Sequence, residues 1–99
     1  MAMTLTTDGN QTILLLSGEV DVKSTPELKK LLNDVDIAHD LIVDGAELSY
    51  IDSSGVACLL MAYKNFAAGA GTVKLRAPSD ALLSVLRVLK FDSLFPIEP

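Results

Sequence analysis

The spacing of hydrophobic positions changes along the chain, and its first part predicts two strands. Apolar and polar residues alternate from Met3 to Thr7, a turn sequence follows at 8–10, and the run at 12–16 is almost wholly apolar. This order is typical of a β-hairpin. Because the second run is apolar on both sides of its pleat, we expect a central strand that is covered on both faces.

The next segment changes to helical spacing. Ser24 and Glu27 have the separation of a capping box, and Pro26 suits a first helical turn. The apolar positions that follow predict a helix with one buried stripe and a solvated polar face that includes Lys29 and Lys30. The stripe consists of Leu28, Leu31, Leu32 and Val35.

Two further strand and helix units complete the pattern. The predicted elements are a strand at 41–45, a connection at 46–51, a second helix from Asp52, a strand at 72–76, a third helix after 79 and a short edge strand at 94–97. The order β-β-α-β-α-β-α, with that edge strand last, predicts an α/β fold with a four- to five-stranded mixed sheet. We expect its later strands to be parallel, because helical crossovers connect them.

The predicted second helix is apolar nearly all round. Cys58 and Met61 lie outside its main stripe, and Lys64 is its first charged residue. Such a helix is either enclosed by other elements or presents apolar surface to a partner. Cys58 and Met61 are therefore candidates for a partner-facing surface, and a homodimer through this helix is an open alternative to a monomer.

Composition narrows the class of protein. With 99 residues, 49% hydrophobic and 21% charged, the chain is expected to form one domain over 1–99, too small for a deep substrate pocket, which argues against an enzyme. A formal net charge of −5 argues against nucleic acid as a partner. The single cysteine allows no disulfide within the chain, and neither a signal segment nor a membrane-spanning run is recognised, so we expect a cytoplasmic protein.

The candidate site lies at the start of the second helix, in the tetrapeptide Asp52-Ser53-Ser54-Gly55. Asp and Ser are preferred N-cap residues, so capping alone explains the tetrapeptide about as well as a functional role does. Three consecutive capping types exceed what one helix needs, however, and a helix N-terminus favours a negative charge by about 0.3–1 kcal/mol. Asp21 and Asp44 each follow a predicted strand, and we expect both at the sheet edge that carries the tetrapeptide.

These features together resemble the STAS domain of the anti-sigma factor antagonist (anti-anti-sigma factor) family. The resemblance is carried by the tetrapeptide 52–55, by Leu-Ser-Gly-Glu-Val-Asp at 16–21 and by the order of the elements, and it covers almost the whole chain. It implies a STAS fold and a regulator that needs no cofactor. The family commonly has a glycine near the end of the last helix, whereas residues 88–92 contain none, so we expect that helix to end differently.

The resemblance also implies a mechanism and partners. In the family the second serine of the tetrapeptide, here Ser54, is phosphorylated by a serine kinase that is also the anti-sigma factor, and a PP2C-type phosphatase removes the phosphate. The unphosphorylated form binds the anti-sigma factor and frees the sigma factor. The residues implied to form the phosphoacceptor loop and the partner-facing edge are Asp21, Asp44, Asp52, Ser53 and Gly55.

Three other functions fit the sequence to different degrees: a transporter subunit, a phosphoaspartate receiver and a serine hydrolase. Another branch of the family is a small subunit of an ABC-type phospholipid transporter, which the apolar second helix would also suit. A phosphoaspartate receiver would use Asp44 but needs a longer, wholly parallel sheet. A serine hydrolase would need Gly-x-Ser-x-Gly, which is missing here, and His39 as its base. His39 is better explained as a solvated loop residue, and one histidine with one cysteine makes no metal site.

Overall fold

The fold is described by a computed structural model that covers residues 2–98. It contains five strands and three helices in the order β1 (Ala2–Asp8), β2 (Gln11–Val20), α1 (Thr25–Asn33), β3 (Asp40–Ile51), α2 (Ser53–Ala67), β4 (Val73–Arg76), α3 (Asp80–Val88) and β5 (Ile97–Glu98). The predicted α/β order is confirmed. The terminal strand exists, but it lies at Ile97–Glu98, after Pro96, and not at 94–97. Residues 1 and 99, the ends of the predicted single domain, lie outside the described residues.

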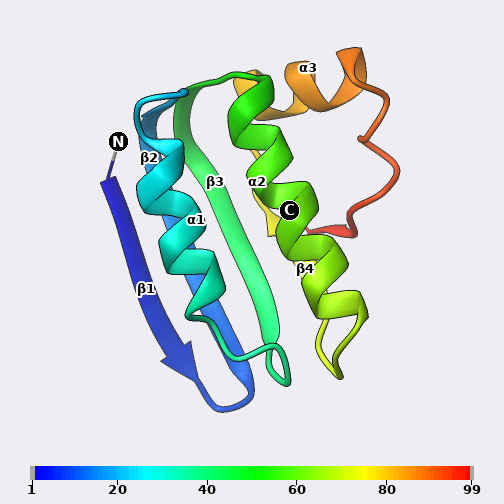
Figure 1. Cartoon of the computed structure of the whole chain (residues 1–99). Coiled ribbons are helices and arrows are strands. Elements are labelled where there is room, and N and C mark those ends of the chain that lie inside the picture. The colour runs from blue at the N-terminus through cyan, green and yellow to red at the C-terminus, as the bar shows by residue number, and fades with distance from the viewer. Residues whose placement is uncertain (1, 99) are drawn as a thin grey trace.

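The strands form one sheet in the order β1-β2-β3-β4-β5 (Figure 1). β1 pairs with β2 in antiparallel fashion, and all later neighbours are parallel, which confirms the predicted mixed sheet. Each parallel neighbour is reached through a helix, so the carboxyl ends of the parallel strands and the helix N-termini share one edge. That edge carries the tetrapeptide.

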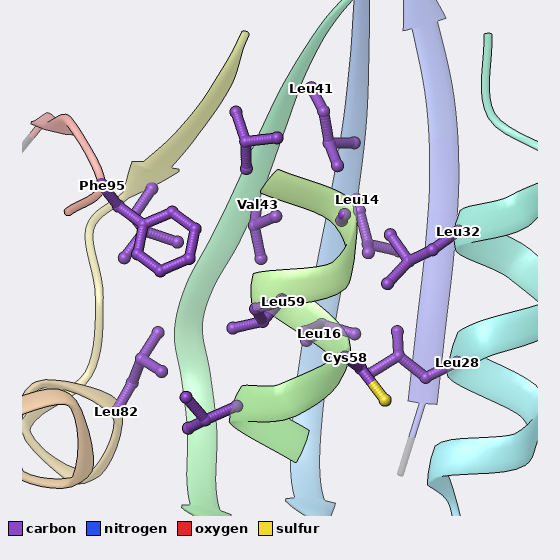
Figure 2. Packing of buried hydrophobic residues seen from close by; sticks show 14 of the residues in the cluster. Leu14, Leu16, Leu28, Leu32, Leu41, Val43, Cys58, Leu59, Leu82 and Phe95 are labelled. Carbon is purple, nitrogen blue, oxygen red and sulfur yellow. The ribbon is translucent and has the colours of Figure 1, made fainter. Parts of the chain in front are cut away.

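One hydrophobic core lies between the helices and a single face of the sheet. Buried side chains from α1, α2 and α3 join one cluster with strand residues such as Leu14, Val43 and Leu75, which are cross-strand neighbours. Figure 2 shows Leu28 and Leu32 of α1 and Leu59 of α2 packed over these strands. The predicted helical stripes are therefore the faces that bury apolar area.

The opposite face of the sheet carries no helix among the described elements. Leu15 is 37% exposed there, so the prediction that the second strand is covered on both faces is wrong, although β2 does lie inside the sheet. Leu15 lies beside Asp44, which lies beside Arg76. The Arg76 Nε donates to Glu98 Oε1 at 2.8 Å, which joins β5 to this open face.

β3 is much longer than the sequence pattern predicts. Residues 46–51 are not a connection but continue the strand up to the tetrapeptide. Two irregularities in its pairing with β2 each add a residue to β3, so its inward positions fall three apart, at Gly45, Leu48 and Ile51. A spacing of three hides the two-residue alternation of a strand. Asp44 consequently lies inside the strand and not at its end.

The start of α1 also differs from the prediction. Ser24 does not cap the helix: its hydroxyl accepts from the Asp21 backbone N–H at 2.9 Å, in the turn before the helix. No capping box with Glu27 forms, because Ser24 has a helical rather than an extended backbone. Pro26 does occupy the first turn, as predicted.

α2 lies between α1 and α3, so of the two explanations for its apolar surface, enclosure is correct (Figure 1). Cys58 is fully buried and lies beside Leu28 of α1 (Figure 2), and the prediction that it faces a partner is wrong. Burial also raises the pKa of its thiol. Met61 is partly buried, and its role in partner contact stays a prediction.

Candidate functional site

The tetrapeptide forms the first turn of α2, and Asp52 is its N-cap. Asp52 has an extended backbone, and its Oδ1 accepts from the backbone N–H groups of Ser54 at 3.0 Å and Gly55 at 3.1 Å. The Ser54 hydroxyl donates to the same oxygen at 2.5 Å. Capping and orientation of the serine are therefore carried out by a single carboxylate oxygen.

This hydrogen bonding keeps Asp52 ionised. The pKa of Asp52 is lowered, first by the Ser54 hydroxyl and then by backbone N–H groups, including that of Val22, which outweigh the opposing effect of desolvation. The charged carboxylate is the form that accepts from all of these donors. Asp52 is therefore a fixed negative group beside the Ser54 hydroxyl at neutral pH.

Gly55 allows the first turn of α2 to approach the strands. A Cβ at this position would lie 2.7 Å from Ile51 Cγ1 and 2.8 Å from Val20 Cγ1, closer than carbon atoms pack. The Asp52 backbone N–H also donates to the Val20 carbonyl at 3.1 Å. These contacts fix the loop against the ends of β2 and β3, so the glycine serves packing and not catalysis.

Asp21 lies in the neighbouring turn between β2 and α1, as predicted for the same edge. Its Oδ1 accepts from the backbone N–H of Lys23 at 2.9 Å, so the side chain orders its own turn. Val22 in that turn is 68% exposed and reaches Asp52 through its backbone N–H. The two turns thus form one surface, in which Asp21 supports the backbone and Val22 adds apolar area.

Asp44 does not join this surface. It lies eight residues before Asp52, which directly follows the end of the same strand, and at about 3.3 Å per residue this separates the two by roughly 20 Å or more. Its Oδ1 accepts from the Ala46 backbone N–H, and its neighbours across the sheet are Leu15 and Arg76. The expectation that Asp44 ends a strand at the tetrapeptide edge is wrong.

A mainly apolar groove borders the tetrapeptide on the side of α3. It is lined by Tyr50, Ile51, Asp52, Ser53, Ser84, Val85, Val88 and Leu89. Val88 is 79% exposed and Tyr50 is 48% exposed, so the groove presents apolar surface beside a polar loop. Sequence reasoning missed this groove, because it assigned Tyr50 to a connection.

Ser53 and Ser54 differ in their surroundings. Ser53 is exposed at the rim of the groove, whereas Ser54 is half-buried and hydrogen-bonded to Asp52. Within residues 2–98 no three His, Cys, Asp or Glu side chains come close enough to hold a metal ion. Over the same residues no helix is long and apolar enough to cross a bilayer.

Fold and site together define the STAS class of domain. The sequence of residues 3–96 matches the family described as "Mlab, STAS domain", and the chain belongs to that family. This confirms the resemblance drawn from the tetrapeptide, the 16–21 segment and the element order. No curated protein matches the sequence.

Solved structures with the same fold include three that bear on the site. A putative anti-sigma factor antagonist from Thermotoga maritima has 17% identity and a TM-score of 0.88, with 98% of this chain and 86% of that one covered. The anti-sigma factor antagonist SpoIIAA in its unphosphorylated form has 22% identity and a TM-score of 0.83, with 97% and 87% covered. Bacillus SpoIIAA in the phosphorylated form has 22% identity and a TM-score of 0.79, with 99% and 91% covered.

Proposed function

We propose that this chain is an anti-sigma factor antagonist: a non-enzymatic protein that binds an anti-sigma factor through the surface around Ser54. The observation that carries the proposal is the Ser54 hydroxyl, which is held at the start of α2 by Asp52 Oδ1 at 2.5 Å. The two preceding residues, Asp52 and Ser53, line an apolar groove. Support also comes from structural similarity to proteins described as anti-sigma factor antagonists, one of them in a phosphorylated form.

Ser54 is the proposed phosphoacceptor of the anti-sigma factor, which acts as the kinase. Asp52 orients the hydroxyl toward its own carboxylate, so the serine oxygen has a defined position for attack on the γ-phosphorus of ATP held by the kinase. The transfer joins the phosphoryl group to Oγ and releases ADP, and the hydroxyl proton passes to solvent. A PP2C-type phosphatase hydrolyses the phosphoserine and restores the donor.

Phosphorylation changes the local charge in a way that suits a switch. The phosphate adds about −1.5 to −2 charge next to an ionised Asp52 that has just lost its hydroxyl donor. The helix N-terminus stabilises the added negative charge by only about 0.3–1 kcal/mol. A change from 99:1 bound to 1:99 bound requires about 5.5 kcal/mol, so the phosphate must also displace partner atoms from the loop.

Variants of the two serines test the proposal. We expect Ser54→Ala to bind the partner and to resist phosphorylation, and Ser54→Asp to bind at least tenfold more weakly. Ser53→Ala is the matched control for phosphorylation, because its hydroxyl is exposed one residue away. Phosphosite mapping by mass spectrometry on protein from its native cell, together with identification of what co-purifies, provides the readout. A protein that never carries phosphate at Ser54 and has no kinase partner contradicts the proposal.

A second candidate function is that of a small subunit in an ABC-type phospholipid transport complex. The observation that favours it is the largely apolar groove, with Val88 79% exposed, because permanent contacts are more apolar than transient ones. In this case a transporter ATPase or permease would co-purify in fixed ratio, with Ser54 unmodified. Genes for a kinase and a phosphatase beside the coding gene favour the switch, and genes for a permease and an ATPase favour the subunit.

A further inference from the structure

β1 is an open edge of the sheet. It runs over seven residues, Ala2–Asp8, and pairs with β2 in an unbroken register from Ala2 to Asp8. Figure 1 shows no element on its outer side, and Leu5 in its centre is 39% exposed. A strand of this kind presents a row of unpaired N–H and C=O groups to any chain that approaches it.

The devices that normally protect an edge are missing from β1. Its residues include no proline, no lysine and no inward-pointing charge, and its pairing contains no bulge. The opposite edge is different, since β5 has only two residues, directly follows Pro96 and is joined by Glu98 to Arg76. Only one of the two edges is therefore open to pairing.

The hairpin geometry shows which groups of β1 point outward. Asp8 and Gln11 close a two-residue turn in which Gly9 has a φ of 60° and Asn10 does not share this left-handed conformation, as in a type II′ turn. The closing pair of such a hairpin is hydrogen-bonded, and hydrogen-bonded pairs then alternate along the strand. Met3, Leu5 and Thr7 consequently direct their backbone groups away from β2.

We propose that β1 pairs with β1 of a second copy of this chain, antiparallel and centred on Leu5. In this register Leu5 lies opposite its own counterpart, and Met3 lies opposite Thr7. These are the residues whose backbone groups are unpaired, so about six hydrogen bonds form and the two sheets become continuous. A register shifted by one residue loses this match, because the outward groups of one strand would face residues already bonded to β2.

The side chains of β1 suit a second copy. Asp8 carries the only charge on the strand, and the two-fold axis places it opposite Ala2 and not opposite itself. The two Leu5 side chains, on the same face as Leu14, approach each other at the axis and cover their exposed area. On that face the groove beside Met3 is rimmed by Glu27, Lys30 and Asp34, which include both signs of charge.

The register places Thr4 opposite Thr6 of the other copy, and this makes the proposal testable by charge. Both side chains are exposed on the face away from the core, so substitutions there spare the fold. We expect the double variant Thr4→Lys/Thr6→Lys to weaken self-association at least tenfold, because it sets lysines directly opposite each other. The matched variant Thr4→Lys/Thr6→Glu sets lysine opposite glutamate at both positions, and we expect it to associate at least as well as the unmodified protein.

Sedimentation equilibrium of the purified full chain over a range of concentrations measures the association, and urea unfolding of each variant checks that the fold is kept. A dimer that the double lysine variant lacks and the charge-paired variant retains supports the proposal. A monomer at all concentrations, or a dimer equally insensitive to both double variants, overturns it. The second result would mean that the copies meet through another surface, such as the groove beside Val88.

Discussion

Asp52 and Ser54 are joined by two hydrogen bonds to one oxygen. Asp52 Oδ1 accepts from both the backbone N–H of Ser54, at 3.0 Å, and its hydroxyl, at 2.5 Å. The residue that begins α2 is thus also the residue that sets the position of the serine oxygen. A change in the serine hydroxyl therefore alters the hydrogen bonding of the helix cap, and a change in the cap alters the position of the hydroxyl.

The first prediction concerns how the stability of the fold changes with pH. A carboxyl whose pKa in the folded protein lies below its unfolded value adds stability above the unfolded pKa, and this stability is lost as the pH falls through the folded pKa. Asp52 is such a group, because its pKa is lowered by Ser54 and backbone N–H groups. We expect Asp52→Asn to lower the urea midpoint at pH 7 and the difference from the unmodified protein to shrink below about pH 4.

Urea unfolding at pH 7 and at a pH below about 4, followed by circular dichroism, measures this difference in the urea midpoint. Asp92→Asn removes an exposed carboxylate outside the site and controls for the change in net charge. A difference between Asp52→Asn and the unmodified protein that stays constant down to pH 2 would show that the ionised cap has no role.

The second prediction concerns Gly55. Gly55→Ala places a methyl group 2.7 Å from Ile51 Cγ1 and 2.8 Å from Val20 Cγ1, so α2 must shift away from the strands. Overpacking of this kind costs about 1–3 kcal/mol, and we expect that loss in the free energy of unfolding. Ser53→Ala, in the same turn but exposed, should change it by no more than about 0.5 kcal/mol. Equal effects of the two substitutions would refute the close-approach argument.

The third prediction concerns the end of α3, where the sequence lacks the glycine that the family commonly has. Lys90 takes up a left-handed backbone with a φ of 63°, and the Phe91 N–H donates to the Leu86 carbonyl at 2.8 Å. The helix therefore keeps a left-handed termination with a residue that is strained in it. We expect Lys90→Gly to raise the free energy of unfolding by about 0.5–1 kcal/mol in thermal or urea denaturation. A lower stability would mean that the lysine side chain outweighs the strain.

The fourth prediction concerns the groove. Val88 is 79% exposed in the last turn of α3, so Val88→Lys should change the free energy of unfolding by no more than about 0.5 kcal/mol. A charge in the centre of an apolar interface should nevertheless weaken partner binding at least tenfold, whichever of the two candidate partners is correct. Asn33→Lys adds the same charge at the end of α1 and serves as the control for binding measured by calorimetry. Unchanged affinity for Val88→Lys would place the partner elsewhere.

Sequence patterns were sufficient for the elements that repeat with a regular period. The stripe of α1 and the hairpin follow from spacing, and the parallel arrangement of β2 to β4 follows from the helical crossovers between them. The tetrapeptide and its neighbouring turn at Asp21 were also placed at the correct edge. Here local preference and tertiary packing agree, so a pattern read from the sequence is sufficient.

The errors around β3 have a common origin in irregular backbone. The two added residues of β3 give inward positions at Gly45, Leu48 and Ile51, a spacing that is typical of neither a strand nor a helix. This hid half of the strand, moved Asp44 into the sheet and left Tyr50 unrecognised as part of the site. The Ser24 error has a different cause: its hydroxyl accepts from the Asp21 backbone N–H in the preceding turn, a local hydrogen bond that competes with capping.

The difference between the two edges of the sheet limits the size of the assembly that copies of this chain can form. Pairing through β1 uses the same strand on both copies, and the short β5 after Pro96 offers no template for a third. An assembly that started at β1 would therefore close at two molecules instead of growing into a filament. Ser54 lies at the carboxyl edge of the strands and not along β1, so such a pair would carry two copies of the site, both left open to partners.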